Sequence, residues 1–152
     1  MAINPNTDFS VSDVLTSAQM NRVPRGVVAY TYATGTDATI TSEEVQITSS
    51  SFTAVANRYY KITYFEPGFG SSVAASMTMR VRLTNISGTV LQTALVYNTG
   101  VQQQSGLLTA FTTFSAGSVT LVATLQNSSG TGSANRSSTN IAFLSVEDVG
   151  PA

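Results

Sequence analysis

Alternation of apolar and polar residues at every second position is the feature that most restricts how this chain can fold. It is cleanest in the segment MTMRVRL at residues 77–83, whose odd-numbered residues are apolar and whose even-numbered residues are Thr or Arg. A repeat of two places successive side chains on opposite faces of a strand and does not fit a helix. The segment therefore predicts a strand that turns one face, including Val81, into a core.

Similar segments, separated by turn residues, follow one another along most of the chain. Strands at a spacing of about 8–12 residues are typical of antiparallel sandwiches and barrels. The predicted fold class is all-β, an antiparallel, jelly-roll-like β-sandwich, and an immunoglobulin-like strand order is the alternative that the pattern leaves open. We expect strands at residues 27–33, 44–48, 51–55, 58–66, 77–83, 89–97, 107–114, 119–125 and 140–146.

Three turn signals give finer expectations about this sandwich. Pro67-Gly68 is expected to end the strand at 58–66, and Ser115-Ala116-Gly117 to join the strands on either side of it as a tight hairpin. At the C-terminus, Val146 is expected to end the last strand, with two acids and a Gly-Pro stop following it.

The first 25 residues differ from the rest of the chain. Residues 1–12 show little periodicity, which predicts an extended arm. Thr16 and Gln19 have the spacing of a capping box, and Pro24 disfavours helical geometry at Val23, so one short helix is expected at about 16–22. The predicted organisation is an N-terminal extended arm with a short helix at 1–25 and a β-sandwich domain at 26–152.

Composition narrows the possible functions. A chain of 152 residues has the length of one domain, and 10% charged residues is far below the usual fraction of about 25%. The 20 Ser and 22 Thr residues supply the polar surface instead. The net charge is −1 and the seven basic residues form no cluster, so binding to nucleic acid is not expected.

Composition also limits where the protein can act and which chemistry it can perform. The chain has no apolar run of about 18 residues and no signal-peptide pattern, so we expect no membrane insertion. It has no Cys, which fits synthesis in a reducing cytoplasm. Without His or Cys, a Ser-His-Asp triad and a thiolate metal site are impossible. We expect no enzyme activity, no metal site and no cofactor.

Carboxylates and aromatic residues remain as candidates for chemistry or binding. Glu43-Glu44, Glu66 and Glu147-Asp148 are interpreted as solvated strand ends, with a catalytic carboxylate pair as the alternative. Asp37 is interpreted as a turn residue, because a calcium site needs more than one local acid. An aromatic cluster is interpreted as part of the core, with a carbohydrate or subunit contact as the alternative for the half that alternation leaves exposed; its members are Tyr59, Tyr60, Tyr64, Phe65 and Phe69.

Three segments together resemble small β-sandwich virion structural proteins of tailed bacteriophages. They are the opening DVLTSAQMNRVPRGVV at 13–28, RYYKIT at 58–63 and the ending VEDVGP at 146–151. The resemblance implies a structural virion protein, most simply a capsid decoration protein that binds the capsid surface as a homotrimer. A tail or fibre module that contacts the host surface or its carbohydrates is the alternative. The implied partners are copies of the chain itself and the major capsid protein or tail proteins, on a virion assembled in the host cytoplasm.

The same resemblance implies assembly by surface contact. The arm and helix would lie on a neighbour, and Arg80 and Arg82 are either solvated or paired with acids of another subunit. The two terminal acids are strand-end solubilisers or partners for a neighbour's arginine. The candidate assembly contacts are Phe9, Val14, Leu15, Met20, Arg22, Arg25, Arg80, Arg82, Glu147 and Asp148.

Overall fold

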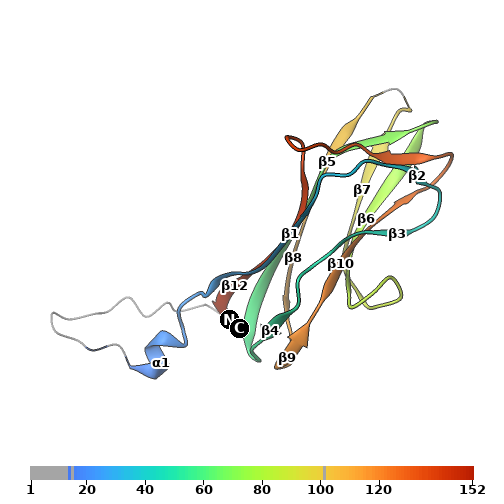
Figure 1. Ribbon diagram of the computed structural model, residues 1–152. Coiled ribbons are helices and arrows are strands. Elements are labelled where there is room, and N and C mark those ends of the chain that lie inside the picture. Colours follow the sequence, from blue (N-terminus) through green and yellow to red (C-terminus); the bar gives the residue numbers. More distant parts are fainter. Residues whose placement is uncertain (1–13, 15, 101) are drawn as a thin grey trace.

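Two antiparallel sheets pack face to face around one core, as the alternation predicts (Figure 1). The computed structural model describes residues 14, 16–100 and 102–152. The helix α1 (Ser17–Met20) precedes the strands and is shorter than expected. Figure 1 shows α1 to the side of the sandwich, not on either sheet. No helix among the described residues is long and apolar enough to cross a bilayer.

The first sheet is built around the last strand of the chain. In it β12 (Ala142–Pro151) lies between β1 (Gly26–Ala33) and β5 (Arg58–Ser71), and β8 (Gln104–Thr113) pairs with the other side of β5. At the far end of β5, β11 (Gly132–Ala134) follows and pairs in turn with β2 (Asp37–Ile40).

The second sheet has the order β3, β10, β6, β7, and a two-stranded ladder closes one end of the sandwich. Neighbouring strands within each sheet are mostly distant in sequence, because the chain passes repeatedly from one sheet to the other, as in a jelly roll. The bounds are β3 (Glu44–Thr48), β4 (Phe52–Ala54), β6 (Ala75–Leu83), β7 (Val90–Asn98), β9 (Gly117–Val119) and β10 (Leu121–Asn127), with β4 paired to β9.

The predicted strand faces are confirmed. Met77, Met79 and Val81 of β6 are buried at 0–1% exposure, and their even-numbered neighbours face outward. On β5, Tyr60 and Tyr64 are buried, while Tyr59 and Lys61 are not. The core is therefore the set of inward-facing residues that the period of two selects.

Two predicted strand ends are wrong, and each has a bulge at the point of error. β5 continues through Pro67-Gly68 to Ser71, because its pairing with β8 shifts register between Glu66 and Phe69 and so tolerates the missing proline N–H. β12 continues past Val146 to Pro151, with a register shift beside Gly150, whose φ of 118° suits glycine.

The predicted hairpin at Ser115-Ala116-Gly117 is also wrong. β8 pairs with β5 in the first sheet, whereas β10 lies in the second sheet between β3 and β6. The connection therefore crosses from one sheet to the other, with β9 on the way and Gly117 at a φ of 139°. Asp37, expected in a turn, begins β2.

Candidate assembly surface and polar cleft

The outer face of the first sheet carries a row of apolar side chains across four strands. The register places Tyr32 opposite Phe143, Phe143 opposite Phe65, and Phe65 opposite Leu107. Phe143 also packs on Tyr30, with ring centroids 5.9 Å apart, and on Phe65, at 5.6 Å. Alternation from the buried Ala29, Ile62 and Leu108 directs these side chains outward.

A second row crosses the same four strands. It runs from Val27 through Glu147 and Lys61 to Phe111. The Lys61 Nζ lies 3.7 Å from a Glu147 carboxylate oxygen, so the two charges cancel within the face. We call the apolar members of this surface the aromatic face: Val27, Tyr30, Tyr32, Tyr59, Phe65, Leu107, Phe111 and Phe143.

The aromatic face is exposed to a degree unusual for large apolar residues. Val27, Tyr32, Leu107 and Phe111 are each 60–64% exposed. Of the aromatic cluster noted in the sequence, Tyr59 and Phe65 belong to this face, whereas Tyr60, Tyr64 and Phe69 are buried. Sequence reasoning missed the other members, although the alternation in residues 27–33 already separates Tyr30 and Tyr32 from Ala29.

Arg80 and Arg82 point outward from β6, as predicted, but they bind an acid of their own chain. Arg82 donates two hydrogen bonds to the Glu43 carboxylate, at 2.7 and 2.8 Å, and the Arg80 guanidinium lies 2.9 Å from it. Thr124 donates a further hydrogen bond to Glu43 at 2.6 Å. These donors, Arg82 above all, lower the pKa of Glu43 to about 2.

The two terminal acids have different environments. Glu147 lies on the outer face beside Lys61, whereas Asp148 is only 1% exposed and accepts hydrogen bonds from Arg58 at 2.5 and 2.7 Å. The interpretation of Asp148 as a solvated strand end is therefore wrong. A sequence pattern gives no warning of this, because Arg58 lies 90 positions away.

Arg58 also holds the segment that leads into the sandwich. Its guanidinium donates to the backbone carbonyl of Asn21, and to that of Val23 at 2.7 Å. The side chains around this anchor remain outside the core: Val14 is 86% and Met20 56% exposed, and Arg22 and Arg25 are exposed as well. Phe9 and Leu15 lie outside the described residues. The assembly role of all these residues remains a prediction.

A third acid, Glu66, is completely buried, so its interpretation as a solvated strand end is also wrong. Arg136 donates to both of its oxygens, at 2.8 and 2.6 Å, and Tyr64 donates to one of them at 2.9 Å. Arg136 also donates to Gln46 at 2.7 Å. Burial, together with the Glu66 charge, raises the pKa of Tyr64 well above its usual value. These four side chains form a hydrogen-bonded network around a buried ion pair inside the sandwich.

Asp37 is hydrogen-bonded to nearby residues of its own chain. Its carboxylate accepts hydrogen bonds from Thr39 and Gln46, each at about 3 Å. Burial raises the pKa of Asp37, but these hydrogen bonds outweigh burial and leave it below its ordinary value. Among the described residues, no group of three or more His, Cys, Asp or Glu could hold a metal.

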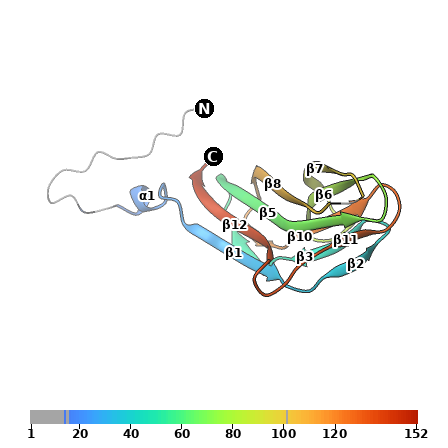
Figure 2. The ribbon, with the colours of Figure 1, turned by 90° about the horizontal axis from the view of Figure 1, so that it is seen from above.

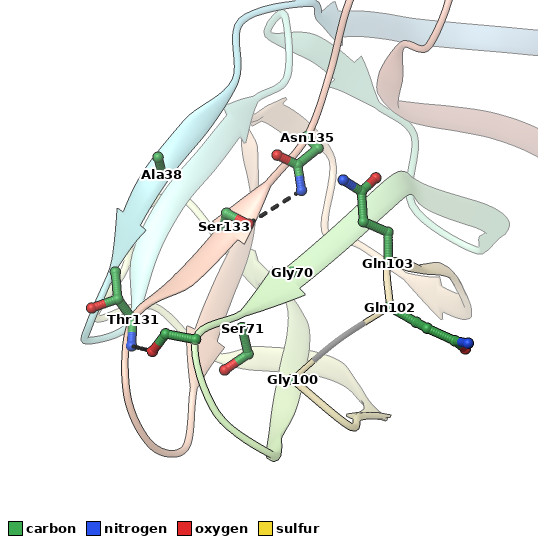
Figure 3. A pocket seen from close by; sticks show the side chains of 10 residues that line it. Ala38, Gly70, Ser71, Gly100, Gln102, Gln103, Thr131, Ser133 and Asn135 are labelled. Atoms are coloured by element: carbon green, nitrogen blue, oxygen red, sulfur yellow. Dashed lines mark hydrogen bonds between the residues drawn. The ribbon is translucent and has the colours of Figure 1, made fainter.

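A polar cleft of about 430 Å³ lies at the end of the sandwich where β5, β11 and the connection after β7 meet (Figure 3). Its walls carry hydroxyl and amide groups and no charged side chain. Asn135 donates to Ser133 at 3.2 Å, and Ser72 accepts from the Thr131 N–H at 2.9 Å. A Cβ at the position of Gly70 would lie 2.4 Å from the Ser133 Oγ, so a larger residue there requires the Ser133 hydroxyl to rotate away. The lining residues are Ala38, Gly70, Ser71, Ser72, Gly100, Gln102, Gln103, Thr131, Ser133 and Asn135.

Comparison with known proteins supports the fold class. The chain is similar to the Eiger TNF structure from S. frugiperda, with a TM-score of 0.52, 9% identity, and coverage of 84% of this chain and 96% of that one. For a structure of murine APRIL at pH 5.0 the TM-score is 0.49 and the identity 9%, over 82% of this chain and 100% of that one. For a structure of infectious bursal disease virus, Gt strain, the TM-score is 0.48 and the identity 16%, over 95% of this chain and 37% of that one. At such identities the likeness concerns the fold alone.

No family model matches the chain, and no curated protein matches it. The strand order and the Eiger similarity define the class: the chain is an antiparallel β-sandwich with jelly-roll topology.

Proposed function

We propose that this chain is a structural protein of a tailed-phage virion, a capsid decoration protein that binds the capsid surface as a homotrimer. The aromatic face is the observation that carries the assembly part of this proposal. Contiguous exposed apolar surface of several hundred Å² marks a contact site in a soluble protein. The three segments that resemble tailed-phage virion proteins support the virion part.

The proposed mechanism is adhesion through surface area, without catalysis. Each square ångström of apolar surface removed from water contributes about 25 cal/mol, so a broad face binds through many weak contacts. Arg58 supports a second contact, between the N-terminal segment and the capsid. It fixes the backbone at Asn21 and Val23, and so positions the adjacent, exposed Met20 relative to the sandwich. In this arrangement the arm reaches the capsid protein while the sandwich contacts its own copies.

Copy number on the particle tests this function. Quantitative mass spectrometry of purified virions should give hundreds of copies per particle, in a fixed ratio to the major capsid protein. Particles that lack the protein should take it up to the same ratio when it is added. A few copies per particle, confined to the tail, would contradict capsid decoration.

The polar cleft favours a second candidate function, a tail or fibre module that contacts host carbohydrate. Amide groups such as those of Gln103 and Asn135, and hydroxyl groups such as that of Ser133, suit a neutral, polyhydroxylated ligand, because they both donate and accept hydrogen bonds. A screen of neutral host oligosaccharides would test this candidate. Binding that is weakened by Gln103→Ala and unchanged by Ile86→Ala, in a distant turn, would support it. Failure across the screen would reject it.

A further inference from the structure

We infer that the aromatic face binds a second copy of this chain, and that the neighbour contributes the edge where β7 and β8 lie side by side (Figure 2). This inference rests on the self-association in the proposed function and names the surfaces that perform it. We call the second surface the β7–β8 edge; it consists of Val90, Leu95 and Tyr97 on β7, next to the β8 strand.

The β7–β8 edge carries three exposed apolar residues, all on β7. Leu95 is 69% and Tyr97 64% exposed, and Val90 is 41% exposed. β7 and β8 each have one side without a hydrogen-bonded partner strand: within the described part of the chain, β7 pairs only with β6 and β8 pairs only with β5. Long apolar edges of this kind promote pairing with another chain unless something covers them.

Neither edge strand carries the usual protection against such pairing. Natural edge strands are blunted by charged residues, often Lys, or by proline. β7 reads VLQTALVYN and β8 reads QSGLLTAFTT, so neither contains a charge or a proline. We therefore expect another molecule to cover this edge when the protein is assembled.

The area of the aromatic face suits a protein interface. An aromatic side chain presents about 150–250 Å² when fully exposed. Four aromatic members exposed at 38–64%, together with Val27 and Leu107, therefore provide on the order of 600 Å² of mostly apolar area. A stable interface buries about 800 Å² on each partner. The polar rim and the backbone of the face supply the remainder.

Charge favours a copy of the same chain over a charged partner. The charges on the face, Lys61 and Glu147, pair with each other. β7 itself carries no charge, and Arg82, which lies opposite Val90 on β6, binds the Glu43 carboxylate of its own chain. Electrostatic complementarity would select a charged partner, and the aromatic face has no net charge to complement. The exposed apolar residues of β7 match this face instead.

The two surfaces differ from each other, and this determines the kind of assembly. A twofold dimer joins a patch to itself, whereas a head-to-tail contact joins two unlike patches and closes into a ring when the rotation permits. The aromatic face and the β7–β8 edge are unlike patches on one molecule. A closed ring, of three copies under the proposed function, buries both on every copy.

Light scattering during size-exclusion chromatography of the full-length protein tests this inference. The wild type should have three times the 15.9 kDa chain mass. Phe111→Glu on the aromatic face and Leu95→Glu on the β7–β8 edge should each give a monomer, with circular dichroism unchanged because both side chains are exposed. Ile86→Glu, at an exposed apolar residue in the β6–β7 turn, is the matched control and should remain a trimer.

Each contrary result overturns a defined part of the inference. A monomeric wild type at micromolar concentration would overturn it entirely and leave the face to the N-terminal segment or another protein. A trimeric Phe111→Glu variant would exclude the aromatic face. A trimeric Leu95→Glu variant beside a monomeric Phe111→Glu variant would exclude the β7–β8 edge. Particle binding is measured separately, so a monomer that still decorates virions would refute this inference and leave capsid decoration standing.

Discussion

The Arg136 guanidinium contacts both carboxylate oxygens of Glu66, at 2.8 and 2.6 Å, although the two residues are 70 positions apart. Glu66 lies on β5 and Arg136 just after β11, so the pair joins two segments inside the sandwich. Glu66 is fully buried and Arg136 is 9% exposed. The remaining hydrogen-bonding groups are partly satisfied by Tyr64 and Gln46.

Arg136→Ala should destabilise the protein by about 3–5 kcal/mol, because it leaves the Glu66 charge buried without a counter-charge. Urea unfolding followed by circular dichroism measures this loss. Lys61→Ala is the control: it breaks a half-exposed ion pair with Glu147 and should cost less than about 1 kcal/mol. Equal losses in the two variants would show that burial of the Glu66–Arg136 pair has no special weight.

The Glu43 site predicts a pH dependence. The pKa of Glu43 falls from an ordinary value of 4.5 to about 2 in the folded protein. A carboxyl whose pKa is lower in the folded state stabilises the fold above its unfolded pKa and loses that contribution as the pH falls. Glu43→Gln should therefore be less stable than the wild type at pH 7, and the difference should shrink between about pH 4.5 and pH 2.

The neighbouring Glu44 supplies the control for this prediction. Burial and the nearby Asp37 charge raise the pKa of Glu44, which is the opposite shift. Glu44→Gln should therefore cause no loss of stability at pH 7. Thermal unfolding of both variants across the same pH range makes the comparison, and a Glu43→Gln deficit that persists at pH 2 would contradict it.

How far the sequence predicts this structure depends on the range of each interaction. The period of two places Val81 in the core and Arg80 outside it, because side-chain direction in a strand is local. The same local rule does not say which strands pair. The chain from β8 to β10 has the turn residues of a hairpin, yet it crosses between sheets because β8 has its partner in β5 and β10 in β3 and β6.

The candidate surfaces show the same division. Arg80 and Arg82 are predictable as outward-facing residues, but their partner Glu43 comes from a segment 39 positions before Arg82. Asp148 and Glu66 are buried because of arginines 90 and 70 positions away, and an acid near a strand end gives no local sign of that. The members of the aromatic face can be predicted from the sequence, since alternation within each strand identifies Tyr30, Tyr32 and Phe143 as outward-facing.

Arg58→Lys should loosen the segment that leads into β1. Lysine keeps the charge but cannot bind Asp148 with two donors while also donating to the carbonyls of Asn21 and Val23. Hydrogen bonds of charged groups contribute about 1.5–3 kcal/mol each, so the amides of residues 20–23 should exchange faster with solvent. Exchange in β6 serves as the internal reference, and unchanged protection at residues 20–23 would show that Arg58 does not hold the segment.

Removal of residues 1–20 should separate attachment from folding. The truncated chain retains the Asn21 and Val23 carbonyls that Arg58 binds, so its melting temperature should stay close to that of the full chain. Under the proposed function its uptake by virions should be lost, because the arm makes the contact with the capsid protein. Removal of residues 1–24 is the comparison: it also deprives Arg58 of both acceptors and should lower the melting temperature. Full occupancy of particles by the shorter protein would contradict the role of the arm.

Val81→Asp should prevent folding. Val81 is completely buried in the middle of β6, opposite Ala123 of β10 and Gln92 of β7. Arg58 and Arg136, the buried arginines of the described residues, already bind Asp148 and Glu66. An unpaired charge in an apolar interior costs several kcal/mol, which is comparable to the whole stability of a domain of this size. Thr78→Asp lies on the same strand with its side chain on the outer face, so it should remain soluble and folded. Circular dichroism and the yield of soluble protein distinguish the two variants. If Val81→Asp folds and Thr78→Asp does not, the two faces of β6 have been assigned in reverse.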